Sequence, residues 1–338
     1  MNELLSAWEE MRQRSDLMVG LAMKRLESAS PCGIFAAVVK PPNRPALVFE
    51  VQPQDVPRAT ILPRSRGLDV STERVEVLGQ RLVRVIIVLT DRKYEELFAT
   101  LGEDLIRHVA GADTGAKAVN IMLRRLHDWQ SFLRRFGAEG MSDDAQRGLF
   151  GELVVLRQLF LPNLAPRDAV MSWVGPDAAP QDYVVRSVAV EVKTTTVDKG
   201  NELRISNLEQ LSVAQLDEVF LAHVMLAEVM DGGMTLGEII GLLKDDSFEG
   251  DQELAEMLDS KLLSAGYVAA QSERYTASYY TSSISIFRVA DGFPRIAREE
   301  VAPGVASARY AITVAACEPF RVPVGELVKR LNGGSHGS

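Results

Sequence analysis

The chain has 338 residues, of which 46% are hydrophobic and 25% are charged, and its formal net charge at pH 7 is -9. This length suggests one large or two ordinary domains, and the composition is that of a globular protein with a substantial core. The acidic balance argues against bulk electrostatic binding of duplex DNA as the whole function, although a local basic groove still attracts phosphates.

The cysteines and the apolar runs indicate a cytoplasmic protein. The two cysteines, Cys32 and Cys317, lie far apart in the sequence, which fits a reducing compartment and argues against a disulfide scaffold or a zinc ribbon. Residues 1–14 are amphipathic and of mixed charge, unlike a signal peptide. Since no apolar run approaches the length of a membrane span, we expect no membrane partner.

The first 137 residues are predicted to form a β-rich module with helices. Residues 2–26 have the pattern of one or two helices. The stretch that follows is rich in Val, Ile and Pro, and its prolines mark turns and sheet edges. The strand candidates in it are residues 34–39, 46–51, 58–62, 75–78 and 82–90.

Two helices are expected next, over residues 94–109 and 116–136. Asp91 is the candidate N-cap of the first helix, and Asp113 or Thr114 that of the second. The second helix carries basic residues that form either a phosphate-contacting face or an ordinary solvated face around a core tryptophan. These basic residues are Lys117, Arg124, Arg125, Arg134 and Arg135.

Gly137 and Gly140 mark the next break in the pattern, and we place the domain boundary there. Residues 1–137 then form the first module, and residues 138–332 form the second domain. Residues 333–338 are rich in Gly and Ser and are expected to be a disordered tail.

The second domain is predicted to begin with a helix that carries an unusually placed carboxylate. Ser142 is its expected N-cap, and its apolar stripe faces a core. Glu152 lies at the edge of this stripe, where a carboxylate is costly unless it is paired or metal-bound. We therefore expect Glu152 to bind a metal, to pair with Arg147 or Arg157, or to extend its carboxylate into solvent.

The same predicted helix contains two glycines, and a turn-rich stretch comes later in the chain. Gly148 and Gly151 would let another element approach the helix closely. Residues 170–174 have the composition of a short strand. The turn-rich stretch after them contains Asp177, which directly follows a proline.

Residues 180–196 have the pattern of a β-hairpin with charged groups on one face. Valines alternate with Glu191 and Lys193, so these two side chains share a face at a spacing of about 6.6 Å. A turn at residues 186–187 would place Asp182 directly across from Glu191. Two opposed carboxylates repel each other, and a divalent cation between them would remove that penalty.

Downstream of the hairpin the chain is expected to complete an α/β domain. A strand over residues 203–206 is followed by a short helix that begins at Ser206 or Asn207 and contains Gln210. An apolar strand over residues 218–229 is expected to be central in the sheet. The remaining predicted elements are helices over residues 235–243 and 252–265, strands over 275–289 and 310–316, and a terminal helix over 322–331.

Asp182 followed by Glu191-Val192-Lys193 on a hairpin resembles the site motif of the PD-(D/E)xK nuclease superfamily. Two flanking stretches strengthen the resemblance: GLFGEL at residues 148–153 and ISNLEQL at residues 205–211. Together they resemble an uncharacterised bacterial branch associated with restriction-modification and phage-defence loci, most firmly over residues 141–226.

The sequence departs from the motif in one position, because Gln181 rather than a proline precedes Asp182. Asp177 does follow a proline and is the alternative metal ligand, but it lies in a turn-rich stretch and farther from Glu191. We therefore prefer Asp182.

The resemblance implies a restriction-endonuclease-like α/β core, which is a mixed sheet flanked by helices, and a Mg²⁺-dependent DNA endonuclease in which Mn²⁺ substitutes. The implied catalytic residues are Asp182, Glu191, Lys193 and Glu152. The implied metal ligands are Asp182, Glu191, the carbonyl of Val192, and Glu152. Ser206 and Gln210 would orient the site or contact DNA, although a cap and a polar helix face explain them equally well.

DNA is the implied partner, and other subunits of a restriction or defence system are further candidates. Cutting both strands with one site per chain favours a homodimer. The alternative function is a non-catalytic subunit that uses a nuclease-like fold to bind DNA or a protein, which the net charge of -9 favours slightly. A third reading is a structural α/β domain in which the motif arose by chance.

Overall fold

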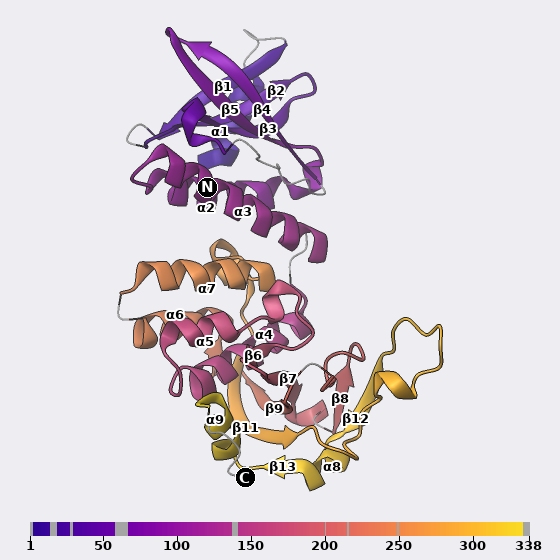
Figure 1. Cartoon of the computed structure of the whole chain (residues 1–338). Helices are drawn as coiled ribbons and strands as arrows, with labels where there is room; N and C mark the ends of the chain where they lie inside the picture. Colours follow the sequence, from indigo (N-terminus) through magenta and orange to yellow (C-terminus); the bar gives the residue numbers. More distant parts are fainter. Residues whose placement is uncertain are drawn as a thin grey trace. The chain divides into compact units, whose positions relative to one another are not determined.

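The chain divides into two compact units, Met1–Gly140 and Met141–Ser338 (Figure 1). The computed structural model describes residues 3–13, 19–27, 30–57, 67–136, 141–199, 201–214, 216–248 and 250–333. The strand predicted over residues 58–62 and residues 334–338 of the predicted tail lie outside the described residues.

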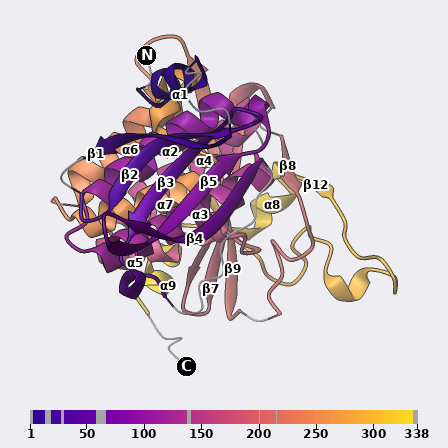
Figure 2. The ribbon, with the colours of Figure 1, turned by 90° about the horizontal axis from the view of Figure 1, so that it is seen from above.

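The first unit is built on a five-stranded antiparallel sheet with the strand order β1-β2-β3-β5-β4 (Figure 2). The strands predicted over residues 34–39, 46–51 and 82–90 are confirmed as β2, β3 and β5. The strands are β1 (Gly20–Glu27), β2 (Gly33–Lys40), β3 (Arg44–Val51), β4 (Leu68–Val77) and β5 (Gln80–Leu89).

Two predictions for this unit are wrong in part. Helix α1 (Glu3–Gln13) is present, but residues 20–27 form β1, because pairing with β2 overrides the helix propensity of that stretch. The strand predicted over residues 75–78 is the end of β4. It stops at a two-residue turn formed by Leu78 and Gly79, both at positive φ, which suits a tight hairpin.

Helices α2 (Glu95–Ala110) and α3 (Gly115–Arg135) confirm the two predicted helices. Asp91 caps the short turn that leads into α2, and Thr114 caps α3 by accepting a hydrogen bond from a backbone N–H. A buried row of aromatic rings joins the helices: Trp8 of α1 stacks on Phe98 of α2, which meets Trp129 of α3 edge-on.

The basic face predicted on α3 is partly a packing surface. The Arg125 side chain is buried, and its guanidinium lies 2.7 Å from Nε2 of His108 and 3.7 Å from the Asp104 carboxylate. These contacts fasten α3 to α2, so Arg125 does not face a phosphate. The side chains of Arg134 and Arg135 lie outside the described residues.

The second unit contains a mixed sheet with the strand order β10-β11-β9-β7-β6, and β13 pairs with β11. Strands β7 and β9 are parallel, and a separate ribbon pairs β8 with β12. The strands are β6 (Tyr183–Val185), β7 (Val188–Thr196), β8 (Glu202–Ile205), β9 (Glu218–Val229), β10 (Met234–Thr235), β11 (Ser278–Arg288), β12 (Tyr310–Thr313) and β13 (Arg321–Val322).

Helices flank this sheet, as the resemblance of the hairpin motif implies for a restriction-endonuclease-like α/β fold. Helix α4 covers one face, and the β8–β12 ribbon packs on the other through a core that includes Leu221, Phe287 and Leu203. The helices are α4 (Asp143–Val155), continued by a π-helical turn (Leu156–Phe160), α5 (Pro166–Ser172), α6 (Leu236–Ser247), α7 (Gln252–Ala265), α8 (Val314–Cys317) and α9 (Val324–Leu331).

Several boundaries in this unit differ from the predictions. Residues 170–174 belong mostly to α5, because Pro166 starts a helix and the Ser172 hydroxyl bonds back to the Ala169 carbonyl. The short helix predicted around Gln210 is a series of turns. Strand β12 ends at Thr313, whose side chain caps α8, and α9 begins two residues later than predicted, after β13.

Cys32 and Cys317 are both buried free thiols. Within the described ranges, no helix is long and apolar enough to cross a bilayer.

Candidate active site

The β6–β7 hairpin has the register that the sequence predicts. Tyr183 pairs with Val190 and Val185 with Val188, so residues 186–187 form the turn. Arg186 takes a positive φ in it. Asp182 directly precedes β6 and therefore lies at the same end of the hairpin as Glu191.

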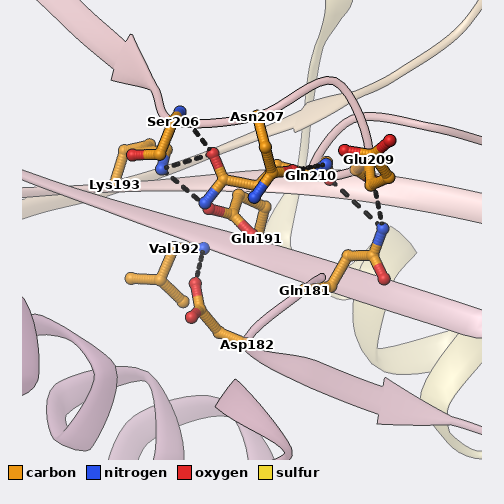
Figure 3. A network of polar contacts seen from close by, with 9 residues as sticks. All are labelled: Gln181, Asp182, Glu191, Val192, Lys193, Ser206, Asn207, Glu209 and Gln210. Carbon is orange, nitrogen blue, oxygen red and sulfur yellow. Dashed lines mark hydrogen bonds and ion pairs between the residues drawn. The ribbon is translucent and has the colours of Figure 1, made fainter. Parts of the chain in front are cut away.

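Asp182 is fixed by contacts from two segments, β7 and residues 174–175. Its Oδ2 accepts a hydrogen bond from the backbone N–H of Val192 at 2.7 Å (Figure 3), and its carbonyl accepts from the N–H groups of Val174 and Gly175. A Cβ at Gly175 would lie 2.8 Å from Asp182 Oδ1, so the absence of a side chain there allows the close approach. The carboxylate is thus held against β7.

Glu191 and Lys193 form a buried ion pair on one face of β7. The Glu191 side chain is 1% exposed, and its Oε1 lies 2.7 Å from Lys193 Nζ, which is itself only 14% exposed. Lys193 also donates to Gln210 Oε1 at 3.3 Å, and the same oxygen accepts from the Ser206 N–H at 2.7 Å (Figure 3). Of the two predicted supporting residues, Gln210 therefore contacts Lys193 directly, and Ser206 contacts Gln210 through its backbone N–H.

Burial sets the electrostatics of this pair. It raises the pKa of Glu191 well above its usual value, the charge of Asp182 and that of Glu152 raise it further, and the Lys193 ammonium opposes the shift. Among the described residues, Oε2 of Glu191 is buried and has no hydrogen-bond partner. A buried carboxylate oxygen in this state is costly unless it gains a proton or a cation.

Glu152 is held near the hairpin by two contacts between α4 and neighbouring segments. Its Oε2 accepts from the indole N–H of Trp173 at 2.7 Å, and its backbone carbonyl accepts from the Tyr183 hydroxyl at 2.8 Å. The candidate partners Arg147 and Arg157 form ion pairs with carboxylates at other positions, namely Asp144 and Asp246.

Asp177, the alternative to Asp182, faces a different group. Its exposed carboxylate lies 2.9 Å from Nζ of Lys261 on α7, which also donates to the Trp173 carbonyl. Asp177 thus anchors the segment before the hairpin to α7, whereas Asp182 contacts β7 itself.

Metal binding at this site needs few protein ligands. Within the described part of the chain, no group of three or more His, Cys, Asp or Glu side chains is arranged to hold a metal ion. Mg²⁺ is commonly held by one or two carboxylates and keeps several waters. Asp182 and Glu191 with the carbonyl of Val192 fit this pattern, and the unpartnered Oε2 of Glu191 is the oxygen that a cation would satisfy.

Sequence reasoning missed the residues that position the site. Gln181 is buried, and its amide donates to the carbonyls of Glu209 and Gln210, which ties the turn beside Lys193 to the hairpin. Trp173 and Tyr183 bind Glu152. The one feature of the sequence that points to these two residues is that a buried Trp or Tyr needs a hydrogen-bond partner for its polar atom.

Gly151 lets α4 approach β7, whereas Gly148 does not face a close neighbour. A Cβ at Gly151 would lie 1.9 Å from Thr194 Oγ1, but one at Gly148 would meet no described atom within 4 Å. The predicted close approach therefore holds at Gly151 only.

We expect Gly151→Ala to lower the free energy of unfolding by about 1–3 kcal/mol, because the added methyl group forces α4 away from β7. Gly148→Ala is the matched control in the same helix. It should raise stability by about 0.5–1 kcal/mol, since alanine favours a helix over glycine. Urea denaturation measures both, and equal effects of the two substitutions would show that the contact at Gly151 is not tight.

A mixed sheet flanked by helices, with Asp182 and the Glu191-x-Lys193 pair meeting at the end of a hairpin, defines a restriction-endonuclease-like protein of the PD-(D/E)xK class. Over residues 4–315 the sequence matches the family described as "Putative PD-(D/E)XK family member, (DUF4420)". The chain belongs to this family. Comparisons with curated proteins and with solved structures give no significant match.

Proposed function

We propose that this protein is a Mg²⁺-dependent DNA endonuclease. The observation that carries the proposal is the buried Oε2 of Glu191, which has no hydrogen-bond partner in the described residues and lies on the same strand as the Lys193 ammonium. An uncompensated carboxylate oxygen beside a lysine suits a site that accepts both a cation and a phosphate.

Asp182, Glu191 and the carbonyl of Val192 would hold the ion, and Glu152 would contact it directly or through water. A bound Mg²⁺ or Mn²⁺ supplies Lewis-acid polarisation of the phosphodiester and an activated water. The chain itself holds the two hairpin carboxylates in place through the Val192 N–H and the buried face of β7.

Lys193 is suited to bind the scissile phosphate. Its ammonium already lies between Glu191 Oε1 and Gln210 Oε1. This ammonium would bind an oxygen on which negative charge develops during hydrolysis. Gln210 and the Ser206 N–H would keep it in position.

We further propose that the enzyme acts in the cytoplasm, in a restriction-modification or phage-defence system. DNA is the expected substrate, other subunits of such a system are expected partners, and a homodimer would bring two sites to the two strands. The resemblance of the motif and of its flanking stretches supports this context.

The test is cleavage of plasmid and linear DNA in Mg²⁺ or Mn²⁺ by the wild type, Asp182→Asn and Asp177→Asn. Asparagine at position 182 keeps an acceptor for the Val192 N–H but removes the charge, so cleavage should fall by about 100-fold or more. Asp177→Asn is the matched control and should keep wild-type activity. Equal residual cleavage in both variants would identify a contaminating nuclease.

The alternative, a non-catalytic DNA- or protein-binding subunit, predicts a different result. Calorimetric titration would then give no heat of Mg²⁺ binding, and DNA affinity would survive Glu191→Ala. A wild type that binds DNA without cutting it in either metal would favour this alternative over the nuclease.

A further inference from the structure

The β8–β12 ribbon presents an outward face that the hydrophobic core does not use. Leu203, Ile205 and Ile312 point into the core, whereas Arg204, opposite Ala311, points outward. The ribbon and the segment before β12 extend to one side of the second unit (Figure 1).

An open hollow of about 570 Å³ lies at the end of the ribbon where Ile205 pairs with Tyr310. Its lining residues are Arg204, Ile205, Ser206, Arg309, Tyr310 and Ala311. Arg309 directly precedes β12, and it lines the same hollow as Arg204. The outward face of the ribbon also carries Glu202, but at the opposite end of β8, across from Thr313.

The hollow carries two uncompensated positive charges. Arg204 and Arg309 are both exposed, and within the described ranges neither guanidinium group has an ion pair or a hydrogen bond. Two guanidinium groups that share a concave surface repel each other unless an anion lies between them. Guanidinium groups bind phosphate oxygens in a bidentate way, which makes phosphate the best match for this pair.

The hollow adjoins the candidate active site through Ser206. The Ser206 N–H donates to Gln210 Oε1, which accepts from Lys193 Nζ. Ser206 thus both lines the hollow and holds the residue that positions Lys193. A polymer with regularly spaced phosphates would reach both places, whereas a single free anion would not.

We infer that Arg204 and Arg309 bind a backbone phosphate of the nucleic acid, next to the phosphate held at Lys193. This inference rests on the proposed function. It also explains how a chain with a net charge of -9 engages a polyanion, because a local positive field is sufficient to attract a phosphate.

The test measures binding of the full chain to a fluorescein-labelled DNA duplex in EDTA, by anisotropy across a range of NaCl concentrations. Arg204→Ala/Arg309→Ala should weaken binding about tenfold or more at low salt and reduce the steepness of the slope of log K against log [NaCl] by about one, because one phosphate contact is lost. Arg204→Lys/Arg309→Lys should keep most of the slope. Inorganic phosphate should compete only weakly with the DNA duplex, because a single free phosphate cannot also contact Lys193.

The matched control is Arg157→Ala/Arg167→Ala, which also removes two positive charges from the second unit. Both arginines form ion pairs on its surface, with Asp246 and Glu253, and such pairs contribute little to stability. The control should bind like the wild type. Equal slopes for the wild type, the Arg204/Arg309 variant and the control would overturn the inference.

The inference and the proposed function fail in distinguishable ways. If the wild type cuts DNA and Asp182→Asn does not, but the Arg204/Arg309 variant binds normally, the nuclease stands and the arginine site is wrong. If the wild type neither binds nor cuts DNA, both are overturned.

Discussion

Replacing Glu191 by glutamine is expected to lower metal-dependent cleavage by about 1,000-fold or more and to leave the protein at least as stable at pH 7. The substitution removes a metal ligand, so activity is lost. It also removes a buried charge whose Oε2 has no described partner, so the folded state loses an unfavourable term. If Glu191 only supported the fold, Glu191→Gln would instead lower stability and leave the cleavage activity of the folded protein unchanged.

The same variant should change the pH dependence of stability. Because the folded-state pKa of Glu191 is raised above 4.5, the folded protein holds a proton that the unfolded chain has already lost. The free energy of unfolding contributed by this group therefore falls as pH rises from about 4.5 through the raised folded value. Glu191→Gln lacks this term, so its advantage over the wild type should grow with pH.

Urea denaturation in EDTA over this pH range measures the difference between the two proteins. Parallel stability curves for the wild type and Glu191→Gln would mean that the carboxyl titrates normally in the folded protein. Cleavage assays on the same preparations complete the comparison, and an active Glu191→Gln enzyme would remove Glu191 from the metal site.

Lys193→Ala is expected to lower the free energy of unfolding by about 3 kcal/mol at neutral pH, because it leaves the buried Glu191 carboxylate without its ammonium partner. Lys193→Ala/Glu191→Gln should regain most of this stability, since the charge that needed a partner is gone. Neither variant should cleave DNA. The cost of the single substitution should shrink in acid, where Glu191 is protonated.

Lys244→Ala provides the matched control for this cycle. Lys244 lies 2.6 Å from the Asp259 carboxylate, but both side chains are about one-third exposed, so the loss should stay below about 1 kcal/mol. Equal costs for Lys193→Ala and Lys244→Ala, or a double variant no more stable than Lys193→Ala, would show that the Glu191–Lys193 pair is not coupled as a buried pair.

The hairpin could be predicted from the sequence because its pattern is local. Valines at every second position fix which face of β7 is buried, and a two-residue turn then fixes the register. The long apolar strand β9 and the helix α7 can also be predicted, since the pattern of each lies within one continuous stretch.

The rest of the site depends on contacts between distant segments. Nothing near Glu152 in the sequence indicates that its carboxylate meets the indole of Trp173. The alternation around Glu191 predicts a shared face with Lys193, but not that turns near Gln210 cover this face and leave Glu191 almost fully buried. Residues 20–27 likewise became a strand through pairing with β2, against their local preference.

The most direct measurement is the position of Mn²⁺ in a crystal soaked with the ion, located by anomalous scattering. The account predicts one peak within about 2.0–2.3 Å of oxygens from both Asp182 and Glu191. A peak bound elsewhere, or Glu191 still paired with Lys193 at saturating Mn²⁺ and no ion beside Asp182, would contradict it.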